Sequence, residues 1–215
     1  MTHPTRRLLA LLALTVSMSA SLTACFPVIM GGAAIGGLVA TDRRTSGAQF
    51  EDEGIELRAS SHIGDNLGDR GHVNVTSYNR RVLLTGEVPS AQDLQLVEQV
   101  VSRVENVQSV VNELAVLGTS TLSQRASDVL VTGRIKASFV DAKDLFANAY
   151  KVVTERGTVY LMGRVTQREA DRATEIARAT SGVQKVVRVF EIISKGELRG
   201  MLPQPAPDTK ATPAK

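Results

Sequence analysis

Cys25, the only cysteine of this 215-residue chain, is the residue whose chemistry the sequence constrains most. It follows a basic start at Arg6 and Arg7, an apolar run at residues 8–16 and small residues up to Ala24. This order is typical of a secretory signal, and the apolar run is too short to cross a bilayer. Because an unpaired thiol is a liability in an oxidising compartment, we expect Cys25 to be chemically used.

The four residues Leu-Thr-Ala-Cys that end at Cys25 resemble the lipobox of bacterial lipoproteins. The resemblance implies cleavage after Ala24, a thioether-linked diacylglycerol on Cys25 and an amide-linked acyl chain such as palmitate. Several acyl chains make a durable anchor. Phe26 is not the Asp that marks inner-membrane retention in enteric-type lipoproteins, so the resemblance implies an anchor in the outer membrane, on its periplasmic face. An ordinary signal peptide, or a buried helix, remains the alternative for residues 1–24.

The other nucleophilic and titratable residues match no catalytic or metal-binding motif. His62, in a predicted polar loop, and His72, at a predicted strand start, lack the His-x-x-x-His or His-Glu spacing of metal ligands. Ser60 and Ser61 are interpreted as a helix end, and the acids at 51–53 as a solvated face at the start of the first helix. We therefore expect no enzyme, no catalytic residue, no metal ligand and no small-molecule substrate.

Charge is divided unevenly along the chain. The formal net charge of +3 falls to +1 once Arg6 and Arg7 leave with the signal, which argues against a nucleic-acid partner. Residues 45–118 carry five arginines and eleven acids, a formal charge of −6, whereas residues 123–202 carry fourteen basic residues and nine acids, a formal charge of +5. Opposite signs indicate that the halves face different partners or face each other.

Two segments of the chain repeat each other. Residues 72–88 match residues 149–165 at an offset of 77, and residues 107–111 match residues 183–187 at an offset of 76. Such self-similarity indicates two copies of one structural unit.

Each copy predicts a helix, two strands, a second helix and a third strand. Alternating apolar residues at 82–88 and 159–165 predict half-buried strands that follow hairpin turns. Ser90 and Thr166 are placed to cap the helices that come next. The sequence therefore predicts an α+β fold of two tandem small domains, each with helices on one face of a three-stranded mixed sheet.

Both copies carry Val-x-Leu-x-Gly-x-Val and then Val-x-x-Val, at 82–88 with 107–110 and at 159–165 with 183–186. This pattern resembles the BON domain, and with the lipobox the whole architecture resembles the dual-BON outer-membrane lipoproteins. The expected organisation is a signal peptide at 1–24, a lipidated Gly/Ala-rich linker at 25–44, BON domain 1 at 45–118, BON domain 2 at 119–202 and a disordered tail at 203–215.

The predicted first helix of the second copy, residues 124–140, has two apolar faces. The core face consists of Val131, Ile135 and Phe139. The second face consists of Ala126, Val129, Leu130, Gly133, Ala137 and Val140. A helix on a sheet needs only one apolar stripe, so the surplus face, flanked by Arg134 and Lys136, is typical of a membrane-surface helix. Packing of this face against the first domain is the alternative.

In the dual-BON lipoproteins this helix is associated with anionic phospholipid, and an aromatic residue follows two positions after the Asp that opens it. Here Leu130 holds that place after Asp128 and lacks the interfacial preference of Trp or Tyr. Lipid binding is therefore expected to be weaker or led by Phe139, Leu145 and Phe146. The predicted lipid-binding residues are Leu130, Arg134, Lys136, Ala137, Phe139 and Val140.

Two functional hypotheses follow. In the first, Cys25 tethers a periplasmic lipoprotein to the outer membrane, and its basic second domain binds anionic headgroups and supports outer-membrane integrity. In the second, the protein is a scaffold or assembly factor that recruits other envelope proteins, and lipid is only the anchor. Neither hypothesis requires a cofactor beyond the covalent lipid on Cys25.

Overall fold

The computed structural model describes residues 42–201. The predicted signal, Cys25 and the tail at 203–215 lie outside the described residues. Both sheets belong to one compact unit of the chain, and across residues 42–201 no helix is long and apolar enough to span a membrane. We call the first repeat domain 1 and the second repeat domain 2.

Domain 1 is a helix, a hairpin, a second helix and a third strand, as the repeat predicts. Its elements are α3 (Ser46–Leu67), η2 (Gly68–Arg70), β1 (His72–Tyr78), β2 (Arg81–Val88), α4 (Ala91–Ser102), β3 (Ser109–Asn112) and β4 (Ala115–Val116). Strand β2 pairs antiparallel with β1 and parallel with β3 and β4. The third strand is divided because the side-chain oxygen of Asn112 accepts the Leu114 N–H at 3.2 Å.

Domain 2 repeats this order with an unbroken third strand. Its elements are α5 (Leu122–Asp141), η3 (Ala147–Ala149), β5 (Lys151–Glu155), β6 (Thr158–Val165), α6 (Gln167–Ala179), β7 (Lys185–Ile192) and the short α7 (Lys195–Met201). Strand β6 pairs antiparallel with β5 and parallel with β7. The predicted α+β fold is confirmed, with β4 as an additional strand in domain 1.

The predicted helix caps are present. Ser90 accepts the Asp93 N–H at the start of α4, and Thr166 forms a reciprocal capping box with Glu169 at the start of α6. Helix α5 begins two residues before its predicted start, because Thr121 and Gln124 form a second capping box. Each box satisfies backbone N–H groups that the first turn leaves without intrahelical partners.

The glycines of the repeated motif allow the two hairpin strands to approach closely. Gly86 has φ of 112°, and a Cβ there would lie 2.0 Å from the carbonyl oxygen of His72. Gly163 has φ of 157°, and a Cβ there would lie 2.4 Å from the carbonyl oxygen of Ala149. A side chain at either position would collide with the backbone at or just before the start of the first hairpin strand, because His72 begins β1 and Ala149 ends η3 just before β5.

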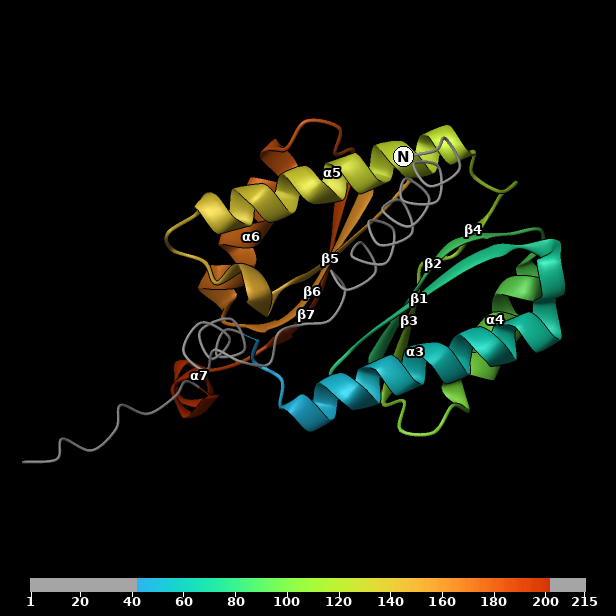
Figure 1. Cartoon of the computed structure of the whole chain (residues 1–215), viewed down its shortest axis with the longest axis horizontal. Helices are drawn as coiled ribbons and strands as arrows, with labels where there is room; N and C mark the ends of the chain where they lie inside the picture. The colour runs from blue at the N-terminus through green and yellow to red at the C-terminus, as the bar shows by residue number, and fades with distance from the viewer. Residues whose placement is uncertain (1–41, 202–215) are drawn as a thin grey trace, which may run out of the picture. The chain divides into compact units, whose positions relative to one another are not determined.

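The helices cover one face of each sheet (Figure 1). In domain 1, α3 and α4 enclose a cluster that includes Ile55, Ala59, Val82, Leu84 and Val97. In domain 2, the predicted core face of α5 packs against β5, β6 and α6, and Val131, Ile135 and Phe139 are all buried.

The opposite faces of the two sheets contribute to a third apolar cluster. It combines Tyr78 and Leu83 of domain 1 with Tyr160, Met162 and Val189 of domain 2. Strands β2 and β6 are therefore buried on both faces along most of their length. Of the two readings of the opposite charges, the structure supports the one in which the halves face each other.

Candidate functional site

The acidic and basic halves meet in ion pairs at the boundary between the domains. Arg156 of the β5–β6 turn contacts Glu87 of β2, with Nε 2.5 Å from Oε1, and the Glu87 side chain is fully buried. Lys151 of β5 contacts Glu56 of α3 at 2.7 Å. Asn79 donates to Glu191 at 2.7 Å. Charge complementarity between the halves thus acts within the molecule.

Residues just before domain 1 clamp both domains. Arg43 donates to both carboxylate oxygens of Glu169 and to the carbonyl oxygen of Arg164, at 2.8 Å. Arg44 pairs with Asp52 at 2.9 Å, and its guanidinium lies 4.3 Å from the ring centroid of Tyr78. Sequence reasoning assigned these arginines to the linker. Their adjacency in an otherwise apolar and small-residue stretch was the signal that could have identified them.

An aspartate of each first helix caps the hairpin turn of its own domain. Asp52 accepts the N–H groups of Asn79 and Arg80, at 2.7 and 2.8 Å, in a turn where both residues have positive φ. Asp128 accepts the N–H groups of Arg156 and Gly157, at 2.8 and 2.9 Å. The interpretation of residues 51–53 as a solvated face is therefore wrong for Asp52, which is buried.

Burial alone would raise the pKa of Asp52, but hydrogen bonds from the Ser77 hydroxyl, the Arg80 N–H and Arg44 outweigh it and hold the pKa below the ordinary 3.8. The carboxylate is thus kept ionised where the backbone of the turn requires an acceptor.

Helix α3 is longer than the sequence predicted. It continues to Leu67, so Ser60, Ser61 and His62 lie on exposed helical positions instead of at a helix end or in a loop. His72 begins β1, as predicted. The carbonyl oxygen of His62 accepts a hydrogen bond from the side-chain amide of Asn66 at 2.8 Å.

The second apolar face of α5 is exposed to solvent. Val129, Leu130 and Val140 are 71, 62 and 72% exposed, and Ala126, Gly133 and Ala137 are exposed beside them. The alternative in which this face packs against domain 1 is therefore wrong. Leu122 extends the face by about one turn before Ala126 and is 83% exposed; the sequence missed it because the predicted helix began at residue 124. We call these seven residues the outer face of α5.

The predicted lipid-binding residues do not all lie on this face. Leu130, Arg134, Lys136, Ala137 and Val140 are exposed together on α5. Phe139 is only 1% exposed, because its ring packs 5.0 Å from Tyr150 in the core.

The assignment of Phe139 to the lipid-binding set is thus wrong: it belongs to the core face alone. Leu145 is also buried, so neither residue can lead lipid binding. Phe146 is 47% exposed, with Arg43 5.9 Å from its ring centroid, and is the aromatic residue that remains accessible near this end of α5.

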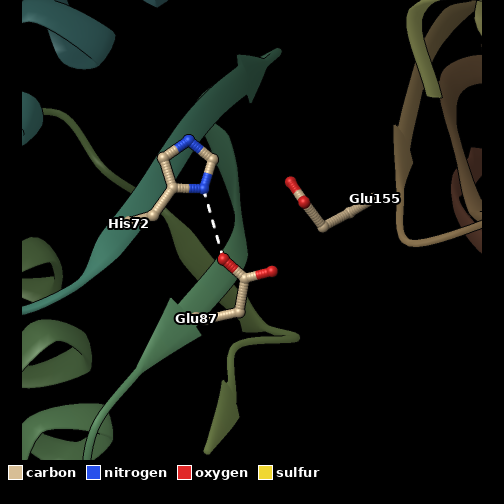
Figure 2. A group of neighbouring side chains, drawn as sticks. All are labelled: His72, Glu87 and Glu155. Atoms are coloured by element: carbon tan, nitrogen blue, oxygen red, sulfur yellow. Dashed lines mark ion pairs between the residues drawn. The ribbon is translucent and has the colours of Figure 1, made fainter. Parts of the chain in front are cut away.

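One cluster has ligand chemistry that the spacing of the sequence concealed. His72 of β1, Glu87 of β2 and Glu155 of β5 offer a nitrogen and two carboxylate oxygens that all lie within 4.8 Å of one another. Figure 2 shows Glu155 directed toward the other two from a different sheet. Burial raises the pKa of Glu155, hydrogen bonding from Asn74 opposes this, and the charge of Glu87 adds to the rise.

Sequence matches to a known domain family and to known proteins extend over most of the described residues. A model of the BON domain matches residues 51–118 and 127–194. The chain is 37% identical to Outer membrane lipoprotein DolP of Haemophilus influenzae over 88% of this chain and 97% of that protein. It is 30% identical to 21 kDa hemolysin of Actinobacillus pleuropneumoniae, over 71% of this chain and 79% of that protein. It is 31% identical to Osmotically-inducible protein Y of Escherichia coli, over 64% of this chain and 70% of that protein.

Proposed function

Because this chain belongs to the family of dual BON-domain proteins that includes Outer membrane lipoprotein DolP, we propose that it is a non-enzymatic lipoprotein of the outer membrane. Cys25 carries the lipid anchor on the periplasmic side, and domain 2 binds anionic phospholipid through the outer face of α5. The pair of attachments supports outer-membrane integrity.

The observation that carries this proposal is the exposure of the outer face of α5. Its large apolar side chains, including Val129 and Leu130, contact solvent although the core face of the same helix is fully packed. Insertion of such side chains beneath the headgroups removes apolar area from water, at about 25 cal/mol per Å². Arg134 and Lys136, both exposed, lie at the edges of the face and can pair with lipid phosphates.

Magnitudes explain why an anchor is needed as well. A basic residue near an anionic surface contributes about 1 kcal/mol, so Arg134 and Lys136 together supply only weak affinity. Attachment through Cys25 converts docking of domain 2 into an intramolecular event at high effective concentration. The durable lipid anchor thus makes the weak contact between domain 2 and the headgroups effective.

Vesicle binding tests the proposal on the soluble chain from residue 26 to residue 215. We expect it to bind phosphatidylglycerol vesicles and not phosphatidylcholine vesicles, and we expect Leu130→Glu to abolish binding. Leu57→Glu is the matched control, because Leu57 is a 74% exposed leucine on the first helix of domain 1. The proposal would be refuted if the chain bound neither kind of vesicle, or if Leu130→Glu and Leu57→Glu reduced binding equally.

One observation favours the scaffold as a second candidate function. Phe50 and Leu57 are both 74% exposed and lie seven positions apart on one side of α3, in a domain of net negative charge. An anionic membrane would repel this helix, whereas a basic segment of another envelope protein would complement it. If Leu57→Glu removes a crosslinked protein partner in cells while vesicle binding persists, the scaffold role is supported.

A further inference from the structure

His72, Glu87 and Glu155 converge at the boundary between the domains although they are distant in the sequence. His72 and Glu87 are directly opposite each other in the β1–β2 ladder, so their side chains share one face of the first sheet. Glu155 ends β5 of domain 2. A ligand held by all three would connect two strands of domain 1 to one strand of domain 2.

The distances are close to those of a metal site. His72 Nδ1 lies 3.4 Å from Glu87 Oε2, and the three ligand atoms lie within 4.8 Å of one another. Ligand bonds of about 2.0–2.2 Å in a tetrahedral site place ligand atoms about 3.4 Å apart. The first pair already has this separation, and the Glu155 carboxylate, which lies within 4.8 Å of both, would have to move closer when a cation binds.

The imidazole of His72 is unsatisfied as it stands. Its Nδ1 atom is enclosed and makes no hydrogen bond to any of the described residues, although it faces the Glu87 carboxylate. An enclosed ring nitrogen without a partner is costly. A bound cation would supply the missing partner.

Neighbouring groups hold the two carboxylates in place. Arg156 Nε contacts Glu87 Oε1, whereas the N–H and hydroxyl of Ser120 donate to Oε2 at 3.2 and 3.3 Å. Asn74 donates to Glu155 at 2.9 Å. Such outer hydrogen bonds orient ligating side chains in metal sites. Oε2 of Glu87 is the oxygen that faces His72, and a cation bound there would share it with the Ser120 donors.

An entry path is present. A cavity of about 300 Å³ is lined by His72, Asn74, Glu155 and Asp128, among others. It admits an ion and water to His72 and Glu155, and the carboxylates of Glu155 and Asp128 outnumber Arg125, the one basic residue of its lining.

We propose that His72, Glu87 and Glu155 bind one zinc(II) ion that joins the two BON domains. One imidazole and two carboxylates are a ligand set that zinc accepts, with water in the fourth position. Calcium requires six to eight oxygen ligands and magnesium prefers near-octahedral oxygens, which these three side chains do not provide. Sequence spacing predicted no metal site because the ligands come from three strands.

Calorimetric titration tests the site on untagged protein comprising residues 26–215, which contains the compact unit and has no cysteine. After treatment with a chelator, zinc chloride is expected to bind with a stoichiometry of one, and magnesium chloride is not. Zinc is also expected to raise the thermal unfolding temperature, because a ligand that binds only the folded state stabilises it.

Substitutions separate this site from adventitious binding. His72→Ala and the isosteric Glu155→Gln are each expected to weaken zinc binding at least tenfold and to abolish the zinc-dependent rise in unfolding temperature. His62→Ala is the matched control, because His62 is exposed on α3, and it is expected to retain both. Absence of a one-to-one isotherm, zinc binding that survives both site substitutions, or equal affinity for magnesium would overturn the proposal.

Discussion

Domain 1 and domain 2 share their internal construction and differ on their outer surfaces. In both, an aspartate of the first helix caps the hairpin turn, Asp52 in α3 and Asp128 in α5. The exposed apolar residues do not correspond, because α3 exposes Phe50 and Leu57 whereas α5 exposes a face that includes Leu130. Inward positions thus preserve the repeated fold, and outward positions are free to give each copy a different partner.

The largest expected effect tests the shared feature. Asp52→Ala is expected to lower the free energy of unfolding by about 3–5 kcal/mol, because it leaves the turn N–H groups without their buried acceptor and leaves Arg44 with Asp42 as its remaining carboxylate. Asp128→Ala is expected to cost less, about 1.5–3 kcal/mol, since Asp128 accepts the two turn N–H groups without an equivalent arginine. Urea denaturation followed by circular dichroism measures both. Equal losses would show that Arg44 adds nothing to the cap of domain 1.

Acid is expected to affect both domains through one carboxylate in each. Burial raises the pKa of Glu169, but Arg43 and Thr166 outweigh it, and the pKa lies below its ordinary 4.5. The pKa of Asp52 is likewise held below 3.8.

A lowered pKa in the folded state contributes stability above the unfolded pKa, and this stability is lost as the pH falls through the folded value. The free energy of unfolding should therefore decrease as the pH falls below about 4.5. Asp52→Asn should reduce the slope of this decrease, as measured by urea denaturation at several pH values. An unchanged slope would contradict the assignment to Asp52.

An aromatic residue at position 130 tests the difference between α5 and α3 in vesicle binding. Leu130→Trp is expected to increase affinity for phosphatidylglycerol vesicles about three- to tenfold, because Trp is larger and prefers the interface. Leu57→Trp on α3 is the control and is expected to leave vesicle affinity unchanged. An equal gain in vesicle affinity from both substitutions would indicate nonspecific adsorption through the exposed Trp.

The smallest effect is expected for an exposed ion pair between the domains. Lys151→Ala removes the contact with Glu56, in which both side chains are partly exposed, and should lower the free energy of unfolding by at most about 1 kcal/mol. A loss comparable to that of Asp52→Ala would show that this pair is a principal connection between the domains.

Periodicity along the chain predicted the structural features that depend only on contacts within one copy of the repeat. The core face of α5, the caps at Ser90 and Thr166 and the hairpin strands all depend on neighbours within one copy, and all are present. The role of Asp52 depends on a turn more than twenty residues away, and the role of Arg43 depends on the other domain. Helical periodicity carries no information on such distant partners.

The sequence also predicted some residues of the candidate site and missed others. Leu130 and Val140 could be placed on a surplus helix face, but Phe139 was assigned to both the core and the lipid-binding set although one helical position cannot serve both. The convergence of His72, Glu87 and Glu155 depends on how two sheets meet. Only the three-dimensional structure reveals it.

The apolar cluster between the sheets has a consequence for biosynthesis. The N-terminal domain emerges first during synthesis and export, and residues 45–118 can complete the core beneath α3 and α4 before domain 2 is available. The sheet face that carries Tyr78 and Leu83 then has no cover until β6 and β7 arrive. A chain that has only domain 1 folded therefore exposes an apolar sheet face for a limited time. A chaperone that binds this face would protect the chain from aggregation until domain 2 covers it.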